Sequence, residues 1–114
     1  MTLDSLSNFK LQMNKIEQLQ TMLMESPDDN FLNYALALEN VKAKNYDQAI
    51  SIFEKLTISA SNYLATYLHY GNLLVDINQP EKAAVIYQKG IKVASNQKNI
   101  KARQELEQAL FLID

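Results

Sequence analysis

The chain contains one histidine and no cysteine, so few side chains are available for acid–base, nucleophilic or metal chemistry. His69 can change its charge near neutral pH, because an unperturbed imidazole has a pKa of about 6.5. A metal site would need further ligands, and the next acidic residue, Asp76, lies two helical turns further on. We therefore predict no metal site, and we interpret His69 as either a pH-dependent contact or a residue on a helix surface.

The motifs of common catalytic sites are also missing from the sequence. It has no glycine-rich phosphate loop, no G-x-S-x-G elbow and no H-E-x-x-H pair. The adjacent carboxylates Asp28 and Asp29 follow Pro27, a pattern typical of a helix cap rather than of a general acid–base pair. The sequence predicts a protein that is not an enzyme and that uses no cofactor.

Length and composition predict one helical domain. The chain has 114 residues, of which 47% are hydrophobic and 21% charged, with only two glycines and two prolines. Its net charge of −2 and scattered lysines do not form the basic stripe that nucleic-acid binding requires. No window reaches the roughly 18 apolar residues of a membrane span, and the N-terminus lacks the pattern of a signal peptide. We expect a cytoplasmic protein that binds neither nucleic acid nor membrane.

Apolar residues recur at spacings of three and four, which is the period of amphipathic helices. Six helices are expected, at residues 9–24, 30–43, 46–58, 63–76, 80–94 and 98–113. Strand-like alternation is absent, so the fold class is all-α. Three methionines fall in the first expected helix, and we interpret them mainly as core-filling residues, with a contact surface for a partner as the alternative: Met13, Met22 and Met24.

Capping and turn residues mark the ends of these helices. Asp28, Asp29 or Asn30 is expected to cap the second helix, and Ser61 or Asn62 the fourth. The pair Lys44–Asn45 and the residue Asn78 are expected to form the hairpin turns, with asparagine in the left-handed backbone conformation. Pro80 is expected in the first turn of the fifth helix, where its missing N–H is not needed.

Residues 30–63 and 64–97 superpose on each other with a shift of 34 residues. The aligned pairs are Tyr34 with Leu68, Ala37 with Gly71, Ala49 with Ala83, Phe53 with Tyr87, and Lys55 with Lys89. A repeat of this length indicates stacked supersecondary units. The small residues of each pair stand where two helices must approach closely, and the aromatic residues are expected to pack beside them.

On these residues the chain resembles the tetratricopeptide repeat, whose pattern is W-x2-L-G-x2-Y, then A-x3-F, then P. The L-G pair falls on Leu36-Ala37 and on Tyr70-Gly71, and A-x3-F falls on Ala49 with Phe53 and on Ala83 with Tyr87. Tyr67 matches the opening aromatic but Asn33 does not, and Ser61 and Ser95 replace the final proline. Pro27 precedes Ser61 by one period, so residues 1–29 resemble the second half of a degenerate preceding unit.

The resemblance implies a short right-handed superhelical array of antiparallel helix hairpins. Its expected parts are an N-terminal helix or half repeat (1–29), two repeat units (30–63 and 64–97) and a C-terminal capping helix (98–114). It also implies a concave groove, lined by the first helix of each unit, that holds a peptide or helix of another protein. The groove residues carried over are Phe31, Tyr34, Leu38, Val41, Leu68, His69, Asn72, Val75 and Asp76.

Tyr34 and Leu38 occupy the places where some members of the family carry the Lys and Asn of a carboxylate clamp, so no such clamp is expected. The groove is instead apolar, with Asn72 as the candidate for pairing with a peptide backbone. Two hypotheses stay open: an adaptor that binds a protein or peptide partner, and a homodimer whose groove is covered by a second copy or by a terminal helix. Three tyrosines are interpreted as packing residues with hydrated hydroxyls: Tyr67, Tyr70 and Tyr87.

Overall fold

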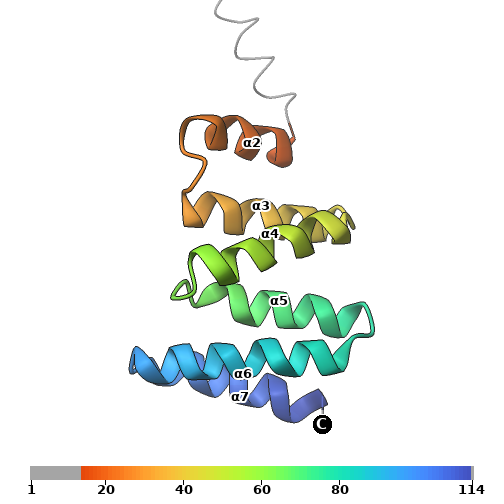
Figure 1. Cartoon of the computed structure of the whole chain (residues 1–114). Helices are drawn as coiled ribbons and strands as arrows, with labels where there is room; N and C mark the ends of the chain where they lie inside the picture. The colour runs from red at the N-terminus through yellow and green to blue at the C-terminus, as the bar shows by residue number, and fades with distance from the viewer. Residues whose placement is uncertain (1–13, 114) are drawn as a thin grey trace, which may run out of the picture.

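The computed structural model describes residues 14–113, and within that range it is entirely helical (Figure 1). The helices are α2 (Lys15–Glu25), α3 (Asn30–Lys42), α4 (Tyr46–Ser59), α5 (Ala65–Asp76), α6 (Pro80–Asn96) and α7 (Ile100–Ile113). The all-α prediction is confirmed, and each expected helix has its counterpart among these six. Residues 9–13 of the first expected helix and the prediction for Met13 lie outside the described residues.

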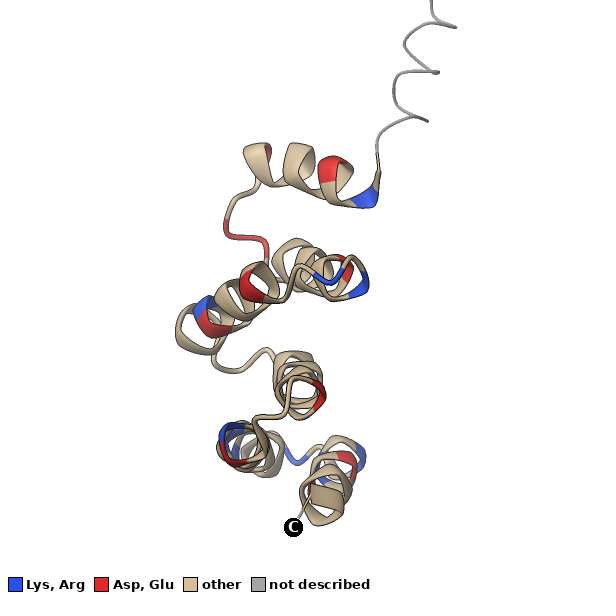
Figure 2. Ribbon diagram, turned by 90° about the vertical axis from the view of Figure 1, so that its right-hand side faces the viewer, with Lys and Arg blue, Asp and Glu red and all other residues tan. Residues whose placement is uncertain are grey.

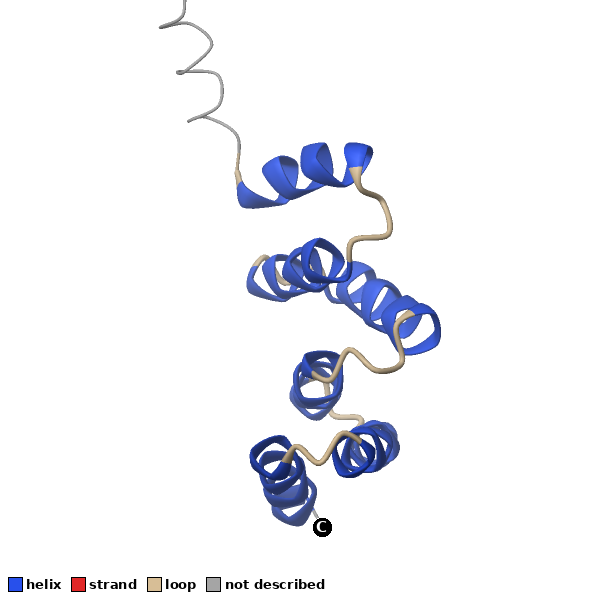
Figure 3. Ribbon diagram, turned by 90° about the vertical axis from the view of Figure 1, so that its left-hand side faces the viewer, coloured by secondary structure: helices blue, strands red, loops and turns tan. Residues whose placement is uncertain are grey.

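The helices stack along one axis, so the described part of the chain measures 56 × 29 × 22 Å. α3, α5 and α7 form one layer and α4 and α6 form the other (Figure 3). Helix α2 lies at one end of the stack, against α3, and α7 lies at the other end, against α5 and α6. In such a stack each helix pair buries its apolar surface against its neighbours rather than around one central core.

Two predicted signals for helix starts agree with the structure. Asp29 caps α3, where its carboxylate accepts a hydrogen bond of 2.8 Å from the backbone N–H of Leu32. Pro80 lies in the first turn of α6. Every helix N-terminus presents N–H groups without a partner in the helix. Asp29 accepts a hydrogen bond from one of them, and Pro80 has no N–H that would need a partner.

The predicted cap of α5 at Ser61 or Asn62 is wrong, because this helix begins only after Leu64 and has no side-chain cap. Its first N–H groups instead bond to backbone oxygens three residues earlier: Thr66 to Tyr63 at 3.3 Å and Tyr67 to Leu64 at 3.2 Å. This tight first turn satisfies the donors without a polar side chain.

Three helices end in the same left-handed turn. The residues that follow α3, α5 and α6 have positive φ angles, of 63° at Lys44, 65° at Asn78 and 57° at Lys98. In each case two N–H groups bond back to carbonyl oxygens of the last helical turn, which defines a Schellman motif. Asn78 adopts the left-handed conformation expected for it.

In the first hairpin the left-handed residue is Lys44 and not Asn45, whose φ is −87°. The prediction rested on the preference of asparagine for this conformation, but the hydrogen bonds decide the position. Lys44 N–H bonds to Val41 at 3.0 Å and Asn45 N–H bonds to Asn40 at 2.8 Å, and this pattern requires the left-handed residue directly after the helix cap.

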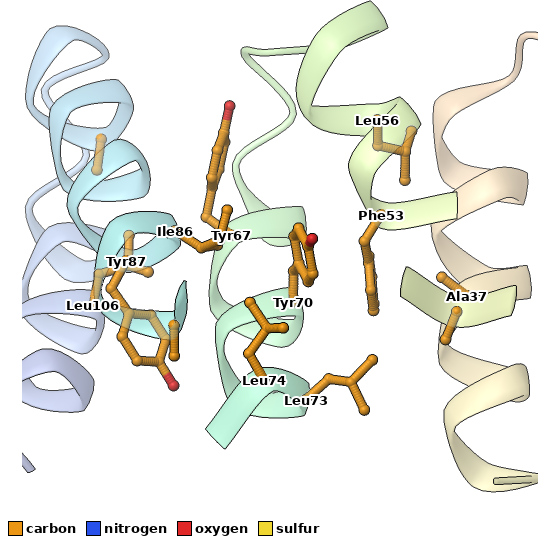
Figure 4. Packing of buried hydrophobic residues seen from close by; sticks show 13 residues of the cluster. Ala37, Phe53, Leu56, Tyr67, Tyr70, Leu73, Leu74, Ile86, Tyr87 and Leu106 are labelled. Atoms are coloured by element: carbon orange, nitrogen blue, oxygen red, sulfur yellow. The ribbon is translucent and has the colours of Figure 1, made fainter. Parts of the chain in front are cut away.

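The buried residues follow the 34-residue repeat. Ala37, Ala49, Ala83 and Phe53 are fully buried, and Tyr87 is 2% exposed. Figure 4 shows the aromatic rings of these units between the helices, with the rings of Phe53 and Tyr70 stacked 5.5 Å apart. All eight residues assigned to repeat packing are buried: Leu36, Ala37, Ala49, Phe53, Tyr70, Gly71, Ala83 and Tyr87.

Both glycines stand at close helix crossings. A Cβ atom on Gly71 would lie 2.2 Å from the ring of Tyr87, so α5 and α6 approach closely only without that atom. A Cβ atom on Gly90 would lie 2.6 Å from Tyr67 and 3.0 Å from Leu106, which brings α6 against α5 and α7. The 34-residue alignment indicates the first crossing, whereas the position one repeat before Gly90 is Leu56, so the alignment does not reveal the second.

Candidate partner-binding face

The side chains predicted to bind a partner project from α3 and α5, the two helices that start the repeat units. On α3, Tyr34, Leu38 and Val41 recur at spacings of four and three, and on α5 Leu68 and Val75 follow the same spacing. All five are half-buried and pack against the core from one side. Helices α3 and α5 belong to one layer (Figure 3), and their side chains form a largely apolar surface, which we call the α3–α5 face.

Three of the nine predicted residues are exposed and not half-buried. Phe31, in the first turn of α3, is 62% exposed. Asn72 and Asp76 are exposed on α5, where Asp76 is the last helical residue. The structure therefore brings together the five half-buried apolar residues and His69, whereas Phe31, Asn72 and Asp76 are exposed.

His69 is part of an aromatic cluster. Its ring lies edge-on to Tyr34, with centroids 5.5 Å apart, and Tyr34 also contacts Tyr63 at 5.6 Å. Burial lowers the pKa of the imidazole, since the charged form is poorly solvated there. Burial raises the pKa of the Tyr34 phenol, and the neighbouring Tyr63 raises it further by a smaller amount. His69 is therefore a half-buried residue of α5 that contacts α3 through Tyr34.

Asn72 is tied to the second layer of the stack. Its Oδ1 atom accepts a hydrogen bond of 2.6 Å from the hydroxyl of Tyr87 on α6. Burial raises the pKa of Tyr87, and the carboxylate of Asp76 adds to that effect. The side-chain oxygen of Asn72 is thus engaged within the protein, while its amide nitrogen forms no hydrogen bond with the rest of residues 14–113.

The hydroxyls of the three packing tyrosines all find protein partners. Besides the bond from Tyr87, the hydroxyl of Tyr67 donates to the carbonyl of Ser61 at 2.6 Å, and that of Tyr70 donates to Glu54 at 3.4 Å. These tyrosines are packed as predicted, and water at their hydroxyls stays a prediction. Buried polar atoms need such partners, and the loop before α5 supplies one of them.

A pocket that the sequence did not indicate lies between α5 and α7 and has a volume of about 290 Å³. It is lined by Leu64, Ala65, Leu68, His69, Asn99, Ala102, Glu105 and Leu106. Two of these residues, Leu68 and His69, belong to the predicted groove. Four of the eight come from α7 and the residue before it, Asn99. The sequence predicts α7 only as a capping helix, so it contains no signal that these residues line a pocket with α5.

A second hollow, of about 330 Å³, lies between α4 and α6 over the side chains of Tyr70 and Leu74. Glu54 and Lys82 stand on its two walls. Burial, then the charge of Glu54 and its hydrogen bond, raises the pKa of Tyr70 to about 12. This hollow lies between helices of the α4–α6 layer and contains no residue of the predicted groove.

The two interpretations of Met22 and Met24 as core-filling residues are wrong. Met22 is 52% exposed and Met24 is 83% exposed, and α2 contains no fully buried residue. Among residues 14–113 the helix packs mainly on α3, so these side chains have little core to fill.

The described part of the chain shows no metal centre and no membrane span. No three His, Cys, Asp or Glu side chains of residues 14–113 are grouped closely enough to hold a metal ion. None of the helices in that range combines the length and the apolar character needed to cross a bilayer. Acidic and basic residues are interspersed along the stack, with no continuous basic stripe over the described residues (Figure 2).

Stacked antiparallel hairpins in two layers, with small residues at each crossing, define a helical-repeat protein. Two solved structures of a tetratricopeptide repeat domain protein from Salinibacter ruber are 34% identical to this chain. The crystal structure covers 75% of this chain and 96% of its own, with a TM-score of 0.71. The solution structure covers 77% of this chain and 89% of its own, with a TM-score of 0.75. The chain belongs to the tetratricopeptide repeat family.

A more distant neighbour shares the fold alone. The solution structure of a Bordetella parapertussis protein is 18% identical, covers 90% of this chain and 89% of its own, and has a TM-score of 0.78. Neither the sequence models of protein families nor the sequences of curated proteins gave a match. The family assignment therefore depends on the 34% identical structures together with the repeat.

Proposed function

We propose that this chain is a non-catalytic adaptor whose α3–α5 face binds a peptide or a helix of a partner protein. The tetratricopeptide repeat fold makes it a helical-repeat module of a kind used for protein interaction. The observation that carries the proposal is the stripe of half-buried apolar side chains at matching positions on α3 and α5, which leaves apolar surface accessible along one layer.

The chemistry of this face favours an apolar segment of the partner. Tyr34 and Leu38 stand where a carboxylate clamp would place Lys and Asn, so a free C-terminus has no cation to bind at these positions. The amide nitrogen of Asn72 is available to donate a hydrogen bond to a backbone carbonyl of the bound segment. The affinity would then come mainly from buried apolar area, with few directional contacts.

Affinity capture from a lysate of the native host tests the proposal. Leu38→Glu places a charge in the middle of the face, whereas Ile58→Glu places one on α4, at a side chain that is already 84% exposed. The wild type and Ile58→Glu should recover the same protein, and Leu38→Glu should not. Far-ultraviolet circular dichroism must show equal helicity for all three. Equal recovery by Leu38→Glu would refute the proposal.

The competing proposal is a homodimer, and one observation favours it. Helix α7 exposes three large apolar side chains, with Ile100 at 65%, Phe111 at 76% and Leu112 at 73%. Light scattering coupled to size exclusion separates the two proposals. A dimer that Phe111→Glu converts to a monomer supports self-association through α7, and a monomer at all protein concentrations contradicts it.

A further inference from the structure

The layer that α3, α5 and α7 form is filled at one place and open at another. Between α3 and α5 the rings of Tyr34, Tyr63 and His69 pack together within 5.6 Å. Between α5 and α7 the corresponding space is empty over about 290 Å³, because Ala65 and Ala102 supply only methyl groups there. The open site therefore lies on the layer proposed to bind the partner, directly beside the aromatic cluster.

The size and lining of this pocket suit a single large side chain. Whole small-molecule ligands occupy pockets of about 300–1,000 Å³, so this one is at the lower limit of that range. Leu106 is 2% exposed at its floor, and Leu64 and Leu68 are half-buried walls. An apolar side chain that enters would exchange water for contact with three leucines.

One full charge stands at the edge of the pocket. Glu105 is exposed and forms no ion pair within residues 14–113, not even with Lys101, one turn earlier on α7. By contrast, Arg103 of the same helix is paired with Glu107 at 3.0 Å. The other polar groups at the pocket are His69, whose lowered pKa keeps it neutral at pH 7, and Asn99.

The helix ends that flank the pocket do not reverse this negative character. The N-terminus of α7 is capped by Asn99, whose Oδ1 accepts from the N–H of Ala102 at 3.0 Å. The N-terminus of α5 carries only the partial positive charge of a helix end, and that charge decays within the first turn. A cation near Glu105 is thus favoured over an anion.

We propose that the α5–α7 pocket receives a large apolar side chain of the bound peptide and that Glu105 pairs with a lysine or arginine within two residues of it. The inference rests on the proposed function, since it assigns a sequence preference to the same peptide-binding layer. The bound segment is then apolar and basic. Arginine has a further advantage, because its planar guanidinium can form two hydrogen bonds with one carboxylate.

Selection from a phage-displayed library of random 12-residue peptides on the immobilised full chain tests the preference. The enriched peptides are synthesised with a fluorescent label, and their affinities are measured by anisotropy. Glu105→Lys reverses the charge, and Glu25→Lys makes the same change in net charge at the exposed end of α2. Ala65→Leu fills the mouth of the pocket. Circular dichroism and melting temperature verify the fold of each variant.

We expect the enriched peptides to combine a large apolar residue with a nearby lysine or arginine. Glu105→Lys should weaken their binding about fivefold, the factor for an exposed ion pair at the upper end of its usual strength, and Glu25→Lys should not. Ala65→Leu should weaken binding as well. Replacing the basic residue of the peptide by glutamine should remove the difference between the wild type and Glu105→Lys.

The remaining outcomes separate this inference from the proposed function. Peptides that lose affinity for Leu38→Glu but bind Glu105→Lys and Ala65→Leu as tightly as the wild type would overturn the pocket assignment alone. Enrichment without any preference for a basic residue would do the same. No enrichment above bare support, or equal binding by Leu38→Glu, would overturn both the pocket assignment and the peptide-binding function.

Discussion

The hydroxyl of Tyr87 donates a hydrogen bond of 2.6 Å to Asn72, and one repeat earlier the same two positions hold Phe53 and Leu38. The second unit therefore has a polar pair between its two helices where the first unit has an apolar pair. The difference between Leu38 and Asn72, which looks like a difference in ligand contacts, thus follows at least in part from the partner across the hairpin. In each unit, the residue of the first helix has the polarity of the residue that it faces on the second helix.

The Tyr87–Asn72 bond should appear as a coupling energy in a double-mutant cycle. Tyr87→Phe and Asn72→Leu are each expected to lower the free energy of unfolding by about 1 kcal/mol, since each leaves one polar atom without its partner. The double variant reproduces the pair of the first unit and should be less destabilised than the sum of the two. Urea unfolding followed by circular dichroism measures all four proteins, and strict additivity would show that the bond contributes nothing.

Gly71→Ala should be among the most damaging small substitutions. Its new Cβ would lie 2.2 Å from the ring of Tyr87, so the ring or the helix must move, at a cost of about 1–3 kcal/mol of unfolding free energy. The first unit already has Ala37 at this position, so the effect is specific to the second hairpin. Adding Tyr87→Leu should recover part of the loss in melting temperature. A Gly71→Ala variant that melts like the wild type would contradict this crossing geometry.

The repeat period made the hairpin crossings predictable, because helices can approach only where side chains are small. Ala37, Ala49 and Ala83 could therefore be assigned to the core from the sequence. The α5–α7 pocket could not, since it depends on where α7 packs. Helix α4 ends at Ser59, whose counterpart is Val93, but α6 continues to Asn96, so the connection to α7 (97–99) is shorter than the one from α4 to α5 (60–64).

Local preferences also failed where backbone hydrogen bonds decided the geometry. Asparagine tolerates the left-handed conformation well, yet Lys44 adopts it, because the Schellman motif fixes the position. Similarly, Ser61 and Asn62 have the side chains of helix caps, but the backbone turn after Ala60 leaves them outside the helix. Side-chain preference identifies a turn more reliably than it identifies the residue that takes the unusual angle.

Thr66 offers a site for stabilisation. It is fully buried, and its Oγ1 atom has no hydrogen-bond partner among residues 14–113. One repeat earlier the position is Leu32, which shows that an apolar side chain suits it. Thr66→Val keeps the shape and removes the unpaired hydroxyl, so the free energy of unfolding should rise by about 1 kcal/mol. Thr66→Ser is the control: it keeps the hydroxyl, loses a methyl group and should destabilise. A lower melting temperature for Thr66→Val would indicate that the hydroxyl is satisfied.

Lys44→Gly should also stabilise the protein. At a φ of 63° a side chain costs about 1–2 kcal/mol, and glycine avoids this strain. Glycine also gains entropy in the unfolded chain, so the expected net increase in unfolding free energy is about 0.5–1 kcal/mol. The matched control is Ala43→Gly one residue earlier, where φ is −80° and glycine should destabilise. Opposite signs for two adjacent glycines, measured by urea unfolding, would verify the turn; the same sign for both would contradict it.

Tyr70 should make stability fall in strongly basic solution. Burial and Glu54 raise its pKa in the folded state to about 12, above the unfolded value of about 10. A group that holds its proton more tightly when folded stabilises fully below the unfolded pKa, and that contribution is lost as the pH rises from 10 to 12. Tyr70→Phe keeps a ring to stack on Phe53 but has no proton to lose, so its urea midpoint should fall less over this interval than that of the wild type. The other tyrosines remain in both proteins, so a difference between the two urea midpoints is specific to residue 70. Equal falls of the urea midpoint in both proteins would exclude Tyr70 as the cause of the loss of stability.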